Sequence, residues 1–177
     1  MYIWIGINVN DQLLPVGEKA RQIENTVGFP NSNFTLPLHV SLKISFPVED
    51  ALFDGVIRTI EEYYSTLSPF VLAVRGIENE NTIVWIRMER NEIIDRIHDD
   101  LNRILLEKYG VPLHEYDTDY KFHPTLFMDN TTAKINAANA QIKDVSLPKT
   151  LTVNRLLIGC SPSGALGTYK VYREYFI

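Results

Sequence analysis

The chain has 177 residues, of which 45% are hydrophobic and 22% are charged. These proportions are typical of a folded globular protein with one ordinary domain and exclude a chain that is disordered throughout. The formal net charge is -5 and no long run of lysine or arginine occurs. This argues against a surface that binds an extended duplex and leaves one nucleotide or one chain end as a partner.

Residues 2–9 are rich in Tyr, Trp and Ile and apolar on both faces, which predicts a central strand. This opening lacks a basic start and a small-residue cleavage site, so we do not expect a signal peptide. No apolar stretch reaches the roughly 18 residues of a membrane helix. The single cysteine, Cys160, excludes an intrachain disulfide. We therefore expect a cytoplasmic protein that does not enter a membrane.

A helix is predicted over about 15–27, where a proline opens it and a glycine ends it. Residues 38–46 alternate polar and apolar side chains, the pattern of a strand with one wet and one dry face. Residues 49–67 repeat apolar positions every three or four residues and predict an amphipathic helix. Residues 69–76 form the next predicted strand.

The second half repeats this order. Its predicted elements are a strand at 82–89, a helix at 91–109, a polar loop at 113–120, a short strand at 121–128, a helix at about 131–142, and strands at 150–159 and 168–176. We interpret the repetition as an internal duplication of roughly 85 residues. The chain is thus predicted to be one domain with two pseudo-symmetric lobes, about 1–76 and 77–177.

Each half carries a strand with a histidine followed two residues later by a hydroxyl side chain. The pairs are His39 with Ser41 and His123 with Thr125. Because residues i and i+2 of a strand point to the same face, each imidazole is expected to lie beside its hydroxyl. A pseudo-twofold axis would bring both pairs into one cleft.

These groups suit the cleavage of a phosphodiester. A neutral imidazole can take a proton from water while a protonated one gives a proton to the leaving oxygen. The hydroxyls can donate hydrogen bonds to the phosphate oxygens that gain charge in the transition state. The scheme requires no metal and no other cofactor. From the residues alone, two unrelated polar strand residues remain an alternative.

The two motifs, their separation of 84 residues and the duplicated element order resemble the two-histidine (2H) phosphoesterase superfamily. That group includes the 2'-5' RNA ligases and the RNA 2',3'-cyclic phosphodiesterases. The closing segment, 153–177, also resembles the closing hairpin of the family. The resemblance implies an α+β fold in which two antiparallel sheets flank a central cleft with helices outside. It assigns catalysis to His39, Ser41, His123 and Thr125.

The resemblance implies a monomeric, metal-independent phosphodiesterase that acts on a 2',3'-cyclic phosphate or a 2',5'-linked nucleotide or RNA end. Members with cyclic-phosphodiesterase activity often carry a basic residue shortly after the second motif, where this chain has Phe127 and Met128. Two alternatives follow. The cleft can bind a nucleotide or RNA end without turnover, or the substrate can be a small non-RNA cyclic phosphate such as an ADP-ribose cyclic phosphate.

Three further residues are candidates for substrate binding. Lys43 follows Ser41 on the polar face of its predicted strand and can replace the missing basic residue, with a solvated lysine as the alternative. Tyr120 can stack on a base. The resembled hairpin places Tyr169 near the cleft.

The remaining histidines and the tryptophans are interpreted as structural. Trp4 and Trp85 occupy equivalent positions in the leading strands of the two halves and are predicted to lie in the core. His98 is predicted to be a surface residue of a helix. His114 lies in an acidic loop, where a solvated loop is favoured over a metal site.

Overall fold

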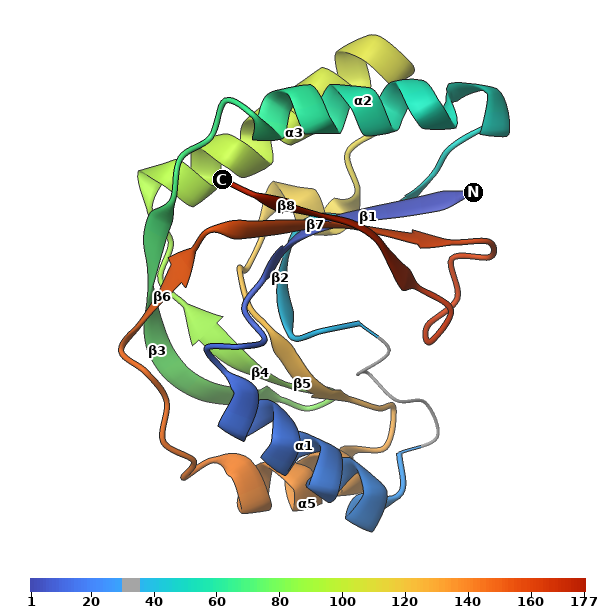
Figure 1. Cartoon of the computed structure of the whole chain (residues 1–177). Helices are drawn as coiled ribbons and strands as arrows, with labels where there is room; N and C mark the ends of the chain where they lie inside the picture. The colour runs from blue at the N-terminus through green and yellow to red at the C-terminus, as the bar shows by residue number, and fades with distance from the viewer. Residues whose placement is uncertain (30–35) are drawn as a thin grey trace.

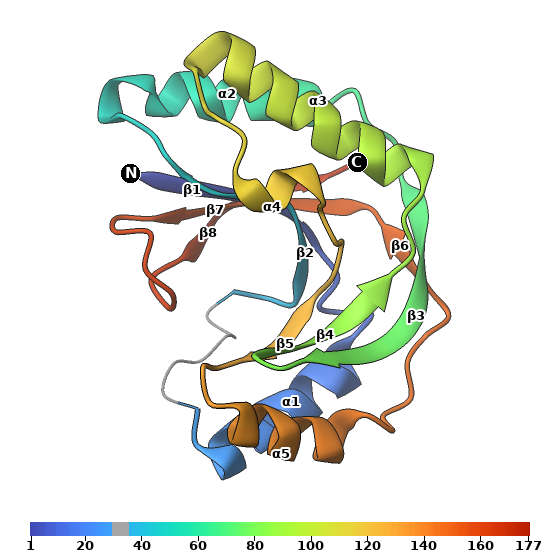
Figure 2. The same ribbon diagram turned by 180° about the vertical axis from the view of Figure 1, so that it is seen from behind.

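The computed structural model describes residues 1–29 and 36–177 of the chain. Within these ranges two four-stranded antiparallel sheets lie between two layers of helices (Figures 1 and 2). In chain order the elements are β1 (Tyr2–Asn8), α1 (Leu14–Val27), β2 (His39–Pro47), the 3-10 turn η2 (Asp50–Leu52), α2 (Phe53–Tyr64), β3 (Phe70–Glu80), β4 (Ile83–Met88), α3 (Glu92–Tyr109), α4 (Glu115–Thr118), β5 (Thr125–Met128), α5 (Thr132–Ile142), β6 (Thr150–Val153), β7 (Arg155–Ser161) and β8 (Lys170–Phe176). The expected α+β class with two antiparallel sheets and outer helices is confirmed.

The two sheets do not divide the chain at the boundary expected between residues 76 and 77. The first sheet has the order β2-β1-β7-β8 and the second has the order β5-β4-β3-β6. The hairpin of β3 and β4 spans the expected boundary, because Gly76 pairs with Arg87 and Ile77 pairs with Ile86. The strands β7 and β8 return to the first sheet. Each sheet is therefore assembled from both halves of the sequence.

The connecting helices also cross between the sheets. Helix α1 joins two strands of the first sheet but packs against α5 and β5, and α3 joins two strands of the second sheet but packs against β2 and α2. Figures 1 and 2 show α2 and α3 outside the first sheet and α1 and α5 outside the second. The main cluster of buried apolar side chains includes residues of both halves. This exchange ties the two motif strands to one core.

Helix α3 forms where the sequence predicts it, and its ends show why. The Asn91 side chain accepts hydrogen bonds at 3.0 Å from the N–H groups of Ile93 and Ile94, which caps the first turn. At the other end Gly110 takes a left-handed conformation, with φ of 67°, which favours glycine. The apolar stripe between these ends is buried.

Several expected boundaries are wrong. The strand expected at 121–128 is reduced to β5, because Pro124 has no N–H to donate to the ladder, although its carbonyl still accepts from Ile86 N at 2.9 Å. The stretch expected at 150–159 is two strands in different sheets, β6 and β7. Part of the loop expected at 113–120 is the short helix α4.

None of the helices in the described ranges combines the length and the apolar character that a membrane span requires.

Candidate active site

Trp4 lies flat on the first sheet because its neighbours on the same face are glycines. Gly159 is its partner across the ladder to β7, and Gly6 follows it on β1. A Cβ atom at Gly159 would lie 2.8 Å from the indole ring, and one at Gly6 would overlap that ring and lie 2.8 Å from the carbonyl oxygen of Val40. Only glycine leaves this space, so two glycines set the position of the indole.

His39 packs against this indole. The two ring centroids are 4.2 Å apart at an interplanar angle of 63°. His39 Nδ1 lies 2.7 Å from the carbonyl oxygen of Pro37, so Nδ1 carries the proton when the ring is neutral, and Nε2 is then the basic nitrogen. Burial lowers the pKa of His39 from 6.5 to about 4, against the opposing effect of the Pro37 carbonyl, and positive charge on His123 lowers it further.

The Ser41 hydroxyl is oriented by the same indole. Trp4 Nε1 donates a hydrogen bond of 2.9 Å to Ser41 Oγ. Because the oxygen accepts this bond, the hydroxyl proton stays available for another acceptor. A single tryptophan therefore places both polar groups of the first motif.

His123 repeats this arrangement on the second sheet. Its ring centroid lies 4.5 Å from that of Trp85, with an interplanar angle of 38°. His123 Nδ1 contacts the carbonyl oxygen of Lys121, again two residues upstream, at 2.5 Å. Burial lowers the pKa of His123 below 6.5, while the Lys121 carbonyl and the Glu80 carboxylate raise it and the Lys121 ammonium lowers it. Among the described residues no hydrogen bond involves Nε2 of either ring, so Nε2 is the nitrogen available to a substrate.

The two sheets contribute to one cavity at this point. A cavity of about 270 Å³ is lined by His39 from β2 and Thr125 from β5, together with Trp4 and Tyr169. The charge on His123 acts on His39 across this region. One residue of each motif thus lines this cavity, while its described lining residues include neither Ser41 nor His123. Tyr169 also lines it, and its hydroxyl is hydrogen-bonded to Ser45.

A family model described as the 2'-5' RNA ligase superfamily matches residues 15–159. The chain belongs to this superfamily. The sequence resemblance to the 2H phosphoesterases is thereby confirmed. No curated protein matches the chain in sequence.

Several solved structures share the fold of the chain. TT0787 of Thermus thermophilus superposes with a TM-score of 0.64 at 15% identity, over 99% of this chain and 97% of that chain. E. coli LigT complexed with 3'-AMP gives 0.59 at 14% identity, over 99% and 96%. Kluyveromyces marxianus Usb1 gives 0.50 at 13% identity, over 99% and 98%. At these identities the similarity concerns the fold.

Lys43, a residue expected to bind the substrate, does not lie at the cleft. Lys43 is only 1% exposed and forms an ion pair with Asp117, whose side chain is fully buried. The alternation of buried and exposed side chains along β2 is interrupted at Lys43. Lys43 pairs with Ile5 of β1, and the register between the two strands shifts both before and after this pair. Lys43 therefore points into the protein and cannot provide the charge expected at the cleft.

The buried ion pair belongs to a polar cluster behind the first motif. Burial raises the pKa of Asp117, but the nearby His98 imidazole and hydrogen bonds from Lys43 and the His114 N–H hold it at about 2. His98 Nε2 lies 3.7 Å from Asp117 Oδ1. The expectation of a surface position for His98 is wrong, since the residue is 4% exposed.

Tyr120 packs against this cluster. Its ring lies 4.9 Å from the His98 ring and 5.1 Å from the Phe122 ring, measured between centroids. Only 7% of the residue is exposed, so it offers no open face for the stacking of a base, contrary to expectation. Burial raises the pKa of Tyr120 and a hydrogen bond with Ser41 lowers it. Its hydroxyl therefore lies near Ser41 of the first motif.

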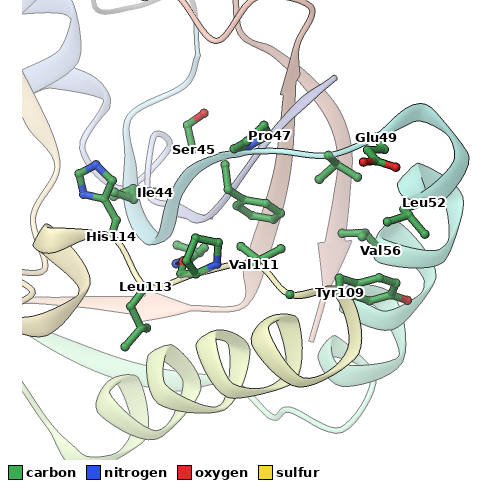
Figure 3. Close-up of a pocket in the computed structure, with 15 residues that line it drawn as sticks. Ile44, Ser45, Pro47, Glu49, Leu52, Val56, Tyr109, Val111, Leu113 and His114 are labelled. Carbon is green, nitrogen blue, oxygen red and sulfur yellow. Dashed lines mark hydrogen bonds between the residues drawn. The ribbon is translucent and has the colours of Figure 1, made fainter.

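His114 is accounted for by local structure. Its side chain accepts from Tyr116 N at 3.3 Å and its own N–H donates to Asp117 at 2.8 Å, which forms a capping box at the start of α4. His114 also borders a largely apolar pocket of about 480 Å³ between the end of β2, the start of α2 and residues 109–114 (Figure 3). The described residues that line this pocket include neither motif histidine.

The interpretation of the tryptophans as core residues omitted their contacts with the motif histidines. Trp4 and Trp85 are 6% and 7% exposed, yet Trp4 packs on His39 of the neighbouring strand β2, and Trp85 packs on His123, which lies just before β5. The signal in the sequence is the equivalent position of these residues in the two halves. A pair of tryptophans that precede both motifs in the same way indicates a shared task beyond filling the core.

Proposed function

We propose that the chain is a metal-independent phosphodiesterase that hydrolyses a 2',3'-cyclic phosphate or a 2',5' linkage at the end of an RNA or nucleotide. The observation that carries this proposal is the repeated arrangement of the two histidines. Each has Nδ1 on a carbonyl oxygen, a tryptophan against its ring and Nε2 free. Membership in the 2'-5' RNA ligase superfamily supports the same chemistry.

In this proposal His39 is the general base. A pKa of about 4 keeps its ring neutral at neutral pH, so Nε2 can take a proton from the attacking water. The water oxygen then forms a bond to phosphorus as the bond from phosphorus to the leaving ribose oxygen breaks. The proton of the water stays on His39 until solvent removes it.

His123 is the general acid. Glu80 favours its protonated form, and the negative charge of a bound phosphodiester adds to this effect. Its proton passes from Nε2 to the leaving ribose oxygen. The hydroxyls of Ser41 and Thr125 donate to the non-bridging oxygens, where charge increases in the transition state. Tyr169 borders the cavity and is proposed to contact the nucleoside.

The direct test is the hydrolysis of a nucleoside 2',3'-cyclic phosphate with EDTA present. We expect His39→Ala and His123→Ala each to lower kcat by about 10²- to 10⁴-fold, the usual contribution of general acid–base catalysis. His114→Asn is the matched control, because it replaces a histidine of a helix cap by another capping residue. Turnover that survives in both alanine variants would exclude the mechanism. Binding of the nucleotide without product would assign a binding module instead.

A further inference from the structure

A second cavity has His123 in its wall. It measures about 800 Å³, and its wall is formed by β3, β4 and residues 119–123, with His123 among the lining residues. The proposed general acid therefore borders this cavity, whereas Tyr169 is among the residues that line the smaller one. A substrate whose scissile phosphate lies at the histidines can extend into it.

The walls of this second cavity carry four cationic side chains with most of their surface in solvent. The exposed fractions are 61% for Arg87, 58% for Lys121, 56% for Arg75 and 54% for Arg90. Each forms an ion pair with one carboxylate, and the Arg87–Glu78 pair has a distance of 2.8 Å. Exposed ion pairs contribute little to stability. A phosphate can therefore replace the carboxylate at small cost.

Two of these cations are nearest to the reacting groups. Arg87 lies two residues beyond Trp85 on β4, so both side chains point to the same face, against which His123 packs. Lys121 Nζ lies 5.5 Å from the centroid of the Trp85 ring. The backbone carbonyl of Lys121 also contacts His123 Nδ1.

We propose that this cavity binds the phosphodiester next to the scissile one, with Arg87 and Lys121 as its ligands. The preferred substrate is then an RNA end of at least two nucleotides. This inference rests on the proposed function. A guanidinium group fits the paired oxygens of a phosphate, and an ammonium group adds a second charge. The charge that is missing after the second motif, at Phe127 and Met128, is thus supplied by β4 and by the residue two positions before His123.

The carboxylates of the cavity limit what it can bind. The lining residues include Glu78, Glu80, Glu89 and Asp119 beside the four cations. One phosphodiester, with a single negative charge, can exchange places with one carboxylate. A polyphosphate would meet several carboxylates at once, and like charges at short range repel. The cavity therefore favours an oligonucleotide over a nucleoside polyphosphate.

The test compares a nucleoside 2',3'-cyclic phosphate with a trinucleotide that ends in the same group. We expect kcat/KM of the unchanged protein to be about 10-fold higher for the trinucleotide, as one added charge-assisted contact implies. Arg87→Ala is expected to lower kcat/KM for the trinucleotide about 10-fold more than for the mononucleotide. Glu78→Gln, which frees Arg87, is expected to lower KM for the trinucleotide.

Arg103→Ala provides the matched control. Arg103 is an equally exposed arginine, 56%, that pairs with Asp100 on α3 outside the cavity, and its replacement should change neither substrate. Equal kcat/KM for the two substrates, or an equal loss for both in Arg87→Ala, would overturn the inference while the proposed function stands. If neither substrate is hydrolysed, the proposed function fails. Calorimetry with a trinucleotide 3'-phosphate then tests the phosphodiester site separately. An affinity that is unchanged in Arg87→Ala would exclude Arg87 as a ligand of this site.

Discussion

The two motif histidines occupy matching positions in surroundings of opposite character. At the first, Trp4 lies across Gly6 and Gly159, and Leu36 and Leu166 line the cavity. At the second, the neighbours of Trp85 on the same sheet face are Arg87, two residues along β4, and Glu78, its partner in β3. The duplicated framework thus has an apolar environment around His39 and Trp4, called the dry region below, and a charged environment around His123 and Trp85, called the charged region.

This difference separates the roles of two chemically identical groups. In the dry environment, burial lowers the pKa of His39 to about 4 and keeps the ring a base. In the charged environment, the pKa of His123 is also lowered by burial, but Glu80 and Lys121 act on it in opposite directions. Solvation and nearby charge act on an imidazole together with its hydrogen bonds, and the bond from Nδ1 to a carbonyl is common to both rings. A symmetric pair of motifs becomes an asymmetric acid and base through the residues beside the tryptophans.

The largest effect that we predict concerns the ion pairs of the two regions. Asp117→Asn leaves the ammonium of Lys43 buried without its counter-charge, and we expect a loss of about 3–5 kcal/mol in the free energy of unfolding. Glu78→Gln breaks an exposed pair and is expected to cost less than about 1 kcal/mol. Urea denaturation of the two variants measures both values. The double change Lys43→Met with Asp117→Leu should recover most of the loss, because no unpaired charge remains.

The same carboxylate predicts how stability depends on pH. The pKa of Asp117 is lowered from 3.8 to about 2 in the folded chain. Its contribution is therefore complete above its ordinary pKa and is lost as the pH falls towards 2. If Asp117→Asn lowers the free energy of unfolding no more than Glu78→Gln at neutral pH, the predicted difference between the buried and the exposed ion pair is wrong.

A smaller effect on stability and kcat is predicted for a change at Gly6, which follows Trp4 by two residues as Arg87 follows Trp85. In Gly6→Ala the added methyl group overlaps the Trp4 ring, and we expect a loss of about 1–3 kcal/mol in stability, typical of overpacking. The indole must shift and take His39 with it, which should lower kcat about 10²-fold.

Gly55→Ala on α2 is the control for this change. Its added Cβ atom would lie 3.3 Å from the Tyr109 hydroxyl, and alanine favours a helix over glycine. Stability and kcat are expected to stay within about 1 kcal/mol and twofold of the unchanged protein. If kcat in Gly6→Ala equals that of the control, the indole does not position the histidine.

The sequence predicts the elements better than their partners, and β2 shows why. Alternation along residues 38–46 correctly indicates a strand, but a bulge in its register turns Lys43 inward, and a bulge depends on the neighbouring strand. The exchange of β3 and β7 between the sheets also depends on pairings between distant residues. The repeated spacing of the motifs, a local feature of each half, leads us to expect all four motif residues in one cleft. Of these four, His39 and Thr125 are among the described residues that line the smaller cavity.

The smallest predicted effect is a shift in the pH profile of kcat/KM, which reports the free enzyme. The acid limb should follow the pKa of His39, about 4, and the alkaline limb should lie below pH 6.5, because His123 must be protonated and its pKa is lowered. Glu80→Gln removes a charge that raises this pKa and should move the alkaline limb to lower pH. Lys121→Gln removes a charge that lowers it and should move that limb to higher pH.

Each of these shifts is expected to be smaller than about one pH unit and to shrink in high salt, because the charges are exposed and screened. The acid limb should stay in place in both variants, since Glu80 and Lys121 act on His123 and the charge that acts on His39 is that of His123 itself. If the acid limb moves and the alkaline limb does not, the assignment is reversed, with His123 as the general base and His39 as the general acid. Opposite shifts confined to the alkaline limb would instead assign the acid to the charged region, where the Glu80 carboxylate favours the protonated ring and the Lys121 ammonium opposes it.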